Sequence, residues 1–366
     1  MTKCLQRYNI VLFMRKVLNK KVFVAMSGGV DSSVAALLLQ KQGYDVTGAH
    51  MICWEGCENN EDKQDAMRVA AVLGIPFLVW DFKKEYKKAV YDYMICEYMA
   101  GRTPNPDVMC NKEIKFGIFL KRALEAGADF MATGHYVRKF GSKLFAAKDK
   151  NKDQSYFLWT LTQDQLKHCL FPIGNYLKSE ARDLARGFGL PVANKKDSQG
   201  LCFVGKVNFA DFIRETLPQK SGVIMTSDGK KIGEHDGAHF YTIGQRHGLA
   251  LGGQAEPVYV AKKDLATNTI MVSQKQDSAL YKRELFAENF NWIGNPPAGG
   301  PEMPFPCQVR IRHRQPLQAC SLFGDGRVVF DFPQRAVAPG QSAVFYLPDG
   351  KPGKDEEMLG GGVIVV

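Results

Sequence analysis

A glycine-rich segment near the N-terminus combines small and polar residues that are suited to binding a phosphate. The segment, SGGVDSS at residues 27–33, follows an apolar run at 22–25 and precedes a helical pattern at 34–40. Its glycines let the backbone approach an anion closely, and the N–H groups at the start of the helix favour negative charge. A tight turn rich in small residues is the alternative interpretation. Since no Lys-Ser or Lys-Thr pair follows the glycines, the segment predicts a phosphate site that is not a kinase-type P-loop.

Cys110 lies in a second chemically suggestive segment, GRTPNPDVMCNK at residues 101–112. The two prolines predict a rigid, extended loop, and a helix is expected to begin near residue 113. A thiol near a helix N-terminus and next to Lys112 has a larger thiolate fraction, and Asp107 can act as a general base or orient a polar substrate. A buried and inert thiol is the alternative. Because a proline-rich loop is a poor place to bury a side chain, we favour a functional cysteine.

Cys202 lies in a third segment, KDSQGLCFVG at residues 196–205, which is also polar and flanked by glycine. Two thiols can hold and release sulfur, because one can carry a persulfide while the other attacks it and forms a disulfide as the sulfur leaves. The other cysteines contain no CxxC pair. Cys53 and Cys57 are four residues apart, but no second pair matches them, so no structural metal is predicted.

Two shorter segments end predicted strands, at the edge where a parallel sheet binds its ligand. GAHM at residues 48–51 places Met51 at this edge, and the alternative for Met51 is a position in the core. ATGHY at 132–136 places Gly134 and His135 at the same edge. The position of His135 favours a functional role over a structural one.

Basic residues recur in three further segments, the first of which combines charge, amide and aromatic residues suited to a phosphate and an unstacked base, or equally forms the N-cap region of a helix. They are KDQSYF at 152–157, YTIGQRH at 241–247 and RIRHRQ at 310–315. In the last of these, strand alternation would place Arg310, Arg312 and Arg314 on one face, where they could follow a sugar-phosphate backbone. A solvated face of a barrel would have the same pattern, and the sequence leaves this choice open.

The elements that must position these residues alternate between strands and helices up to about residue 200. Strands are predicted at 22–26, 45–51, 77–81 and 129–133. Helices are predicted at 32–42, 62–73, 86–100, 113–126, 162–170 and 178–187. This order predicts an α/β fold with an N-terminal doubly wound parallel sheet, whose ligand lies beyond the carboxyl ends of the strands.

From about residue 222 the sequence changes to short β-rich pieces. A Pro- and Gly-rich stretch at 295–301 indicates a linker, and strands of a small barrel are predicted at 307–311, 318–323, 328–332 and 343–347. We therefore expect a basic N-terminal extension at 1–20, a catalytic domain at 21–215, a small β-rich central domain at 216–290 and a C-terminal β-barrel at 291–366.

The composition favours a polyanionic partner and a reducing compartment. The 366 residues carry 48 lysines and arginines against 38 acids, for a net charge of +10. Nine irregularly spaced cysteines do not resemble the framework of a secreted protein, so we expect a cytoplasmic location. No apolar stretch approaches a membrane span, and no membrane partner is expected. The basic start of the chain is more simply an extension than a mitochondrial presequence.

Taken together, SGGVDSS, GRTPNPDVMCNKEIKF, ATGHY, KDQSYFLW, DSQGLCFVG, TIGQRHGL and PGQSAVFY resemble the motifs of the bacterial tRNA-specific 2-thiouridylases, which belong to the PP-loop ATPase superfamily. The resemblance runs from about residue 20 to the C-terminus. It implies an enzyme that adenylates the C2 carbonyl of the wobble uridine of tRNA with ATP and Mg²⁺. Sulfur from a persulfide-carrying donor protein then replaces AMP, either as a persulfide or as released hydrosulfide.

The resemblance also implies roles for individual residues. Cys110 resembles the catalytic nucleophile, Cys202 the cysteine that receives the persulfide and Asp107 the acid/base residue. Residues matching the ATP site are Ala25, Met26, Ser27, Gly28, Gly29, Val30, Asp31, Ser32, Met51 and Gly134. Residues matching tRNA contacts are Asn105, Pro106, Asp107, His135, Lys152, Asp153, Gln154, Arg312, His313 and Gln341. Asn105 and Pro106 would contact the target base.

Two other functions compete with this one. A PP-loop synthetase that forms amides would explain SGGVDSS, but it gives Cys110, Cys202 and the basic C-terminal region no purpose. A non-catalytic RNA-binding protein with a degenerate nucleotide fold would bind tRNA regardless of ATP and would tolerate substitution of Cys110.

Overall fold

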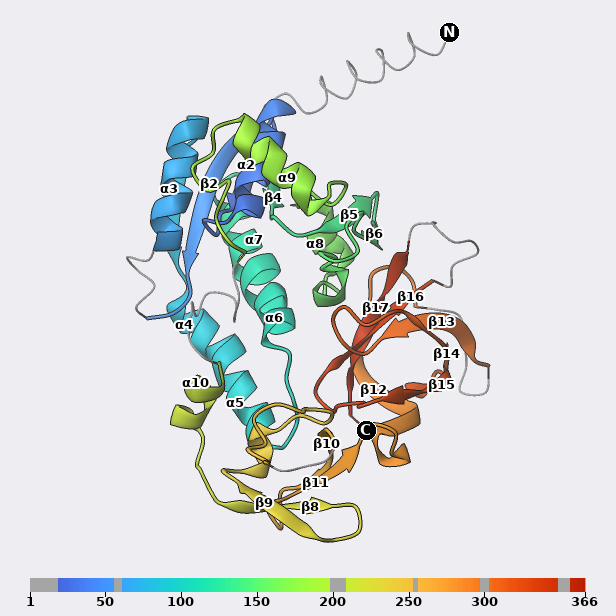
Figure 1. Ribbon diagram of the computed structural model, residues 1–366. Coiled ribbons are helices and arrows are strands. Elements are labelled where there is room, and N and C mark those ends of the chain that lie inside the picture. Colours follow the sequence, from blue (N-terminus) through green and yellow to red (C-terminus); the bar gives the residue numbers. More distant parts are fainter. Residues whose placement is uncertain are drawn as a thin grey trace. The chain divides into compact units, whose positions relative to one another are not determined.

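The computed structural model describes residues 19–55, 61–197, 209–252, 256–296, 303–347 and 356–365. The chain forms two units, one made of residues 1–87 and 109–205 and the other of residues 88–108 and 206–366. Cys202, Cys57 and most of the predicted linker at 295–301 lie outside the described residues. Figure 1 gives the positions of the labelled elements along the chain.

The first unit contains a five-stranded parallel sheet in the order β3-β2-β1-β4-β7. Its strands are β1 (Lys21–Ala25), β2 (Asp45–Ile52), β3 (Phe77–Asp81), β4 (Phe130–Ala132) and β7 (Cys169–Leu170). The main helices of this unit are α2 (Val30–Lys41), α3 (Glu61–Leu73), α7 (Leu120–Glu125), α8 (Gln163–Lys167) and α9 (Lys178–Gly187). The predicted α/β fold with a parallel sheet is confirmed.

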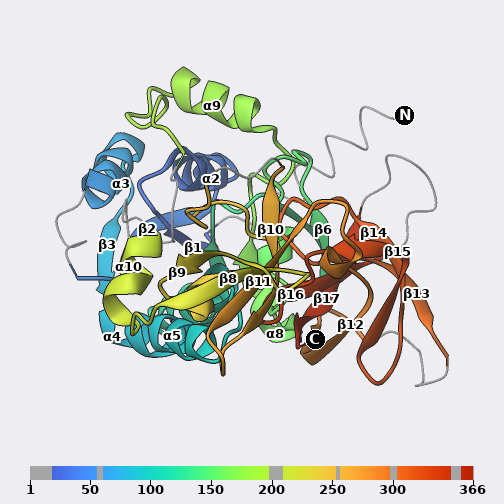
Figure 2. The same cartoon turned by 60° about the horizontal axis from the view of Figure 1, so that its bottom comes forward.

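Helices α2, α3 and α9 lie together on one side of this sheet, as Figure 2 shows. Val34, Ala35 and Leu38 of α2 are buried in one core with Val22 and Val24 of β1. Ala181 and Ala185 of α9 join the same core, since their small side chains, four residues apart, lie on one face of the helix. This packing fixes the start of α2 directly after the end of β1.

The helix predicted at 162–170 is too long. Helix α8 ends at Lys167, and Cys169–Leu170 pairs in parallel with Met131 and Ala132 as the fifth strand. Thr162 caps α8 by accepting a hydrogen bond from the Gln165 N–H, and the Gln165 Oε1 accepts one from the Thr162 N–H. A strand of two residues leaves too short a pattern to be recognised beside a helix.

The helix predicted at 113–126 begins earlier, and this changes the setting of Cys110. α6 (Pro106–Met109) continues into the π-helix η2 (Cys110–Phe119) and then into α7. Pro106 occupies the first helical position, where its missing N–H costs nothing, and the Asn105 Oδ1 accepts a hydrogen bond from the Val108 N–H at 3.3 Å. The expectation of an extended loop around Cys110 is therefore wrong: an asparagine cap followed by proline starts a helix here.

The helix predicted at 86–100 is also composite. It consists of α4 (Lys83–Tyr86), the π-turn η1 (Lys87–Tyr91) and α5 (Asp92–Met99). In the second unit, Met94 and Tyr98 of α5 pack with Ile213 and Leu217, at and just beyond α10 (Phe209–Thr216).

The rest of the second unit is built from two β-structures. The first is a four-stranded sheet in the order β10-β11-β8-β9, with β8 (Gly222–Thr226), β9 (Lys231–His235), β10 (Val258–Asp264) and β11 (Thr269–Gln274). The second is a barrel in the order β12-β15-β14-β13-β16-β17, closed by pairing of β12 with β17. Its strands are β12 (Tyr281–Trp292), β13 (Phe305–Arg310), β14 (Gln318–Leu322), β15 (Arg327–Arg335), β16 (Ser342–Tyr346) and β17 (Glu357–Ile364). The predicted C-terminal barrel is confirmed.

Strand β12 spans the predicted boundary between the central domain and the C-terminal barrel, at residues 290 and 291. It pairs with β15 from Tyr281 onwards, so the first barrel strand lies largely before that boundary. Among the described residues, no helix is both long enough and apolar enough to cross a membrane.

Candidate active site

The glycine-rich segment forms a turn between β1 and α2 that only small residues can make. Gly28 has φ +76°, and a β-carbon on it would lie 2.0 Å from the carbonyl oxygen of Asp62. The N-cap residue of α2 is Gly29, which has no side chain to cap the helix. The start of α2 therefore presents backbone N–H groups and the positive end of its dipole, the arrangement that binds a phosphate.

Hydroxyl groups hold this turn in shape. The Ser27 N–H donates to the Ser32 Oγ at 3.2 Å, and the Ser33 hydroxyl donates to the carbonyl of Gly29 at 2.7 Å. Gly134, just beyond β4, packs against the same turn, because a β-carbon there would lie 2.5 Å from the backbone nitrogen of Ser32. The sequence pattern thus places Gly134 correctly beside the loop.

The ends of β1 and β2 lie next to the turn. Met26 and Met51 are buried, and the Nδ1 of His50 lies 2.8 Å from the carbonyl oxygen of Met26. Burial lowers the pKa of His50 below its usual value, so its ring is neutral at pH 7. Met51 is buried at the end of β2, and its assignment to the ATP site stays a prediction.

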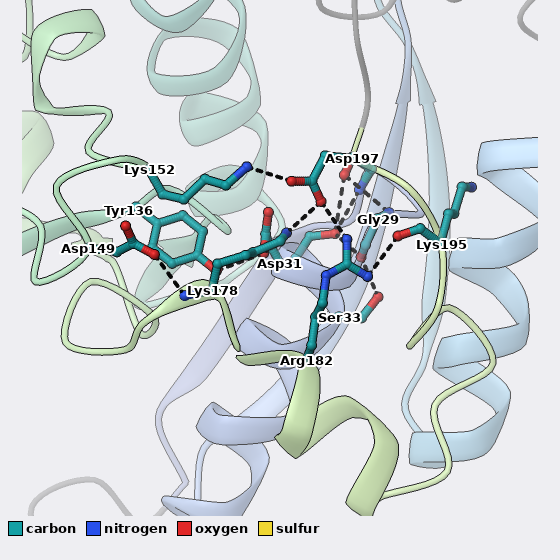
Figure 3. Close-up of polar contacts among 12 residues, drawn as sticks. Gly29, Asp31, Ser33, Tyr136, Asp149, Lys152, Lys178, Arg182, Lys195 and Asp197 are labelled. Carbon is teal, nitrogen blue, oxygen red and sulfur yellow. Dashed lines mark hydrogen bonds and ion pairs between the residues drawn. The ribbon is translucent and has the colours of Figure 1, made fainter. Parts of the chain in front are cut away.

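A network of charged groups lies beside the start of α2 (Figure 3). The Lys178 ammonium lies 2.7 Å from the Asp31 carboxylate and 2.9 Å from that of Asp197, and the side chain of Lys178 is only 13% exposed. The Tyr136 hydroxyl donates to Asp31 at 3.0 Å. Burial, followed by the negative charge of Asp31, raises the pKa of Tyr136 far above its ordinary value, so this hydroxyl stays protonated.

Asp197 receives two more cations. Lys152 lies 2.5 Å from one carboxylate oxygen, and the Arg182 guanidinium lies 2.7 Å from the other. Burial alone would raise the pKa of Asp197, but hydrogen bonds from Lys152 and Lys178 outweigh it and lower the pKa to about 2. Lys178, Arg182 and Asp197 were missed by the sequence reasoning; the spacing of Lys178 and Arg182 on one helix face is the only signal that could have suggested them.

Cys110 is the first residue of η2, and its side chain is only 1% exposed. The prediction of a cysteine in an open loop is therefore wrong. Asp107 precedes it by three residues on the same continuous helical segment, and that spacing places the two side chains on one face. The π-helix is tight at Gly117, where a β-carbon would lie 2.9 Å from the carbonyl oxygen of Lys112. Because Cys202 is outside the described residues, the pairing of the two cysteines stays a prediction.

Three residues predicted to contact tRNA have internal partners in the first unit. Buried Asp153 accepts hydrogen bonds from the Ala147 N–H at 3.0 Å and from the Ser155 hydroxyl at 3.0 Å. The side-chain oxygen of Gln154 accepts one from the Tyr136 N–H at 2.9 Å. His135 is 6% exposed, its Nδ1 lies 2.7 Å from the Thr133 hydroxyl, and burial holds its pKa well below the usual range.

The second unit brings together four segments that are far apart in sequence. The Gln341 side-chain amide donates to the carbonyls of Thr103 at 3.0 Å and of Pro104 at 3.2 Å. The Thr103 hydroxyl donates to that of Thr242 at 3.1 Å, and the Arg312 guanidinium donates to the carbonyl of Ile243 at 2.6 Å. The segment that carries Asn105 and Pro106 is thus supported by the barrel and the central domain.

The prediction that three arginines at 310–314 share one face of a strand is wrong. β13 ends at Arg310, and Arg314 has φ +64°, so residues 311–315 form a turn in which strand alternation does not hold. Arg310 is half-buried, with its guanidinium 3.4 Å from Glu356. Arg312 also donates to the carbonyl of Ala336 at 3.1 Å, whereas Arg314 is exposed. The three arginines therefore have three different environments.

Within the described ranges, no three His, Cys, Asp or Glu side chains gather in a way that could hold a metal ion. The charged network beside α2 contains carboxylates that face lysines and an arginine, which is not the donor set of a metal site.

Comparison with known proteins gives the family. Residues 20–206 match a model described as a tRNA methyl transferase HUP domain, residues 210–274 a tRNA methyl transferase PRC-barrel domain and residues 282–364 an aminomethyltransferase beta-barrel domain. Among solved structures, the U34-tRNA thiolase NcsA of Methanococcus maripaludis with its [4Fe-4S] cluster is 17% identical, covers 57% of this chain and 70% of its own, and has a TM-score of 0.33.

Curated relatives match over nearly the whole chain. The tRNA-specific 2-thiouridylase MnmA 2 of Geobacillus kaustophilus is 47% identical over 359 residues, which is 94% of each chain. The tRNA-specific 2-thiouridylase MnmA of Bacillus subtilis is 46% identical over 94% of each chain. That of Francisella tularensis subsp. novicida is 46% identical over 95% of this chain and 99% of its own. With its parallel sheet, glycine turn and C-terminal barrel, this chain belongs to the tRNA-specific 2-thiouridylase family.

Proposed function

We propose that this protein is an ATP-dependent tRNA sulfurtransferase that converts the wobble uridine of tRNA to 2-thiouridine. The observation that carries the proposal is the presence, within one unit, of a glycine turn at the start of α2, suited to an anion, and of a helical cysteine at position 110. Identity of 47% with a tRNA-specific 2-thiouridylase over 94% of both chains supports the same chemistry. An amide-forming synthetase would need the turn but not Cys110.

ATP would bind with its phosphates at the start of α2. The residues we assign to this site are Ala25, Met26, Ser27, Gly28, Gly29, Val30, Asp31, Ser32, Met51 and Gly134. The close packing of Gly28 against the backbone of Asp62 and of Gly134 against that of Ser32 supports this assignment, since it holds the turn at the start of α2 in a fixed shape. We propose that Mg²⁺ enters with the phosphates, because this ion is usually held by phosphate oxygens and few protein ligands.

The first chemical step activates the base. The C2 oxygen of the uridine attacks the α-phosphate, pyrophosphate leaves, and the oxygen becomes part of a good leaving group, AMP. Backbone N–H groups at the start of α2 would stabilise the negative charge that develops on the phosphates. The base must leave its stack to reach the site, as other base-modifying enzymes require.

The second step transfers sulfur. A persulfide on Cys202 supplies the terminal sulfur, which forms a bond to C2 as the bond from C2 to the adenylated oxygen breaks. The Cys110 thiolate attacks the Cys202 sulfur, so the S–S bond of the persulfide is replaced by a Cys110–Cys202 disulfide and AMP departs. Attack by hydrosulfide released in the same exchange gives the same products. Asp107 would take or supply the proton.

The tRNA contacts that we propose come from several segments of the chain. Asn105, Pro106 and Asp107 would contact the target base, with support from the hydrogen bonds of Gln341 to Thr103 and Pro104. Arg312 and His313 would contact the tRNA. Because His135, Asp153 and Gln154 use their side chains internally, we propose that they act on tRNA by shaping their segments. The sulfur donor would be a protein persulfide, and the compartment the cytoplasm.

The experiment that tests this function is mass analysis of tRNA nucleosides after incubation with ATP, Mg²⁺ and a sulfur donor. We expect 2-thiouridine, AMP and pyrophosphate in equal amounts. Since the matching family models are described as methyl transferases, a parallel reaction contains a methyl donor without ATP. A methylated uridine in that reaction, with no 2-thiouridine in the first, would overturn the proposal.

A further inference from the structure

Three cations in the first unit converge on one carboxylate. Lys152, Lys178 and Arg182 lie 2.5, 2.9 and 2.7 Å from the oxygens of Asp197. The four side chains are only 13–30% exposed, so the cluster is neither fully solvated on the surface nor fully buried in the core. Figure 3 shows Lys152, Lys178 and Arg182 approaching Asp197 from different directions.

The cations lie beside the start of α2. Lys178 contacts Asp31, the second residue of that helix, at 2.7 Å, while it also contacts Asp197. Arg182 is held in place by hydrogen bonds to the carbonyls of Ala193 at 3.1 Å and Lys195 at 2.9 Å. Ammonium and guanidinium groups bind phosphate oxygens as readily as they bind carboxylates. The cluster therefore has the chemistry of a phosphate site that a protein carboxylate fills.

We propose that Lys152, Lys178 and Arg182 bind the pyrophosphate portion of ATP and that Asp197 is an internal substitute for it in the nucleotide-free protein. This inference rests on the proposed ATP site. The Asp197 carboxylate keeps three like charges close together when no ligand is present, since otherwise they would repel one another. An arriving pyrophosphate group brings more negative charge and more acceptor oxygens, and it takes the three donors from Asp197.

The exchange also favours release of the product. Once pyrophosphate has been cleaved from ATP, Asp197 competes with it for the same three donors. This competition lowers the apparent affinity of the protein for free pyrophosphate. An internal competitor thus weakens the binding of free pyrophosphate, a product of the proposed adenylation step.

The test is calorimetric binding of inorganic pyrophosphate to the full-length protein without Mg²⁺. Asp197→Asn keeps the size of the side chain but removes the competing charge, so we expect pyrophosphate to bind about three- to tenfold more tightly. Asp183→Asn is the control, because Asp183 lies on α9, the helix that carries Lys178 and Arg182, and its ion pair is with Arg186, outside the cluster. The control is expected to bind like the wild type. If Asp197→Asn binds pyrophosphate as tightly as the wild type or more weakly, the inference is overturned. That result is expected if Asp197 is a magnesium ligand or a purely structural residue.

A second variant guards against loss of folding. Lys178→Met should weaken pyrophosphate binding about ten- to hundredfold, since it removes a charged donor, whereas Arg186→Gln should not. Thermal unfolding of each variant shows whether it is folded. If Lys178→Met binds pyrophosphate like the wild type, the cation cluster is not the site. The proposed function is judged separately by 2-thiouridine formation, so the failure of one proposal is distinguishable from the failure of the other.

Discussion

A β-carbon on Gly134 would lie 2.5 Å from the backbone nitrogen of Ser32. The end of β4 is therefore in direct contact with the first turn of α2, and neither partner is a flexible side chain that could move aside. This contact connects two motifs that are about 100 residues apart in the sequence. It fixes the position of the glycine turn relative to the end of β4.

Gly134→Ala should therefore weaken ATP binding by about tenfold or more, because the added methyl group must push the first turn of α2 away from the phosphates. Binding of ATP by calorimetry checks this result. Gly187→Ala is the control, since a β-carbon there meets nothing within 4 Å. Unchanged ATP affinity in Gly134→Ala would move the nucleotide away from this turn.

Cys110→Ser is expected to abolish 2-thiouridine formation while tRNA affinity stays nearly the same. The substitution replaces sulfur with oxygen at a buried helical position, so the fold is kept, but the hydroxyl cannot attack a persulfide. Nucleoside mass analysis and a tRNA binding assay measure the two effects. The exposed Cys96 provides a control, Cys96→Ser, that should retain activity. Normal thiolation by Cys110→Ser would contradict the two-thiol mechanism.

Arg312→Ala should lower the stability of the second unit by about 1–3 kcal/mol, because the carbonyls of Ile243 and Ala336 lose a charged donor. If Arg312 also contacts a tRNA phosphate, the slope of log affinity against log salt concentration falls by about 1. Arg314→Ala, at an exposed position, separates the two effects because it should leave stability unchanged. Thermal unfolding and tRNA binding at several salt concentrations provide the measurements. An unchanged salt slope in Arg312→Ala would place the phosphate contact elsewhere.

His135 should make the protein less stable in weak acid. Burial lowers the pKa of His135 in the folded protein, so the unfolded chain binds a proton more readily below about pH 6.5. Folding stability therefore falls as the pH drops through this range, by up to about 1.4 kcal/mol per pH unit for this group. His135→Asn should lose less stability than the wild type between pH 7.5 and 5.5 in urea unfolding. A loss of the same size in both proteins would mean that His135 is protonated when folded.

The parts of the fold that sequence reasoning predicted well depend on local patterns. The strand before Ser27 and the helix after it follow from apolar runs on both sides of a glycine turn. The start of the helix before Cys110 could not be recognised in the same way, because prolines indicate a loop unless Asn105 is read as a cap. The prediction of an arginine face was wrong because β13 ends at Arg310. The end of this strand is set by the turn that follows it, and the alternation of residues in the sequence does not reveal that turn.

The charged network lay beyond sequence reasoning for another reason. Lys152, Lys178, Arg182 and Asp197 come from a turn, a helix and a loop, and spacing along the sequence brings together only Lys178 and Arg182, on one helix face. The helix that carries these two residues, α9, packs in one core with α2. Ion pairs between separate elements are a property of the tertiary structure, so the sequence predicted the glycine turn but not the cation cluster beside it.

The ten-residue π-helix that begins at Cys110 has a consequence for how the thiol is aimed. A π-turn contains one more residue than an α-turn needs, so the segment stores an extra residue between Cys110 and the buried anchors Phe116 and Phe119. An ordinary α-helix turns the chain by about 100° per residue, and the wider π winding turns it by less. If the same ten residues were wound as an α-helix, Cys110 and Asp107 would therefore turn together away from their present direction. The direction of the Cys110 side chain thus depends on the winding of the segment between it and Phe119, which is set by hydrogen bonds of the backbone.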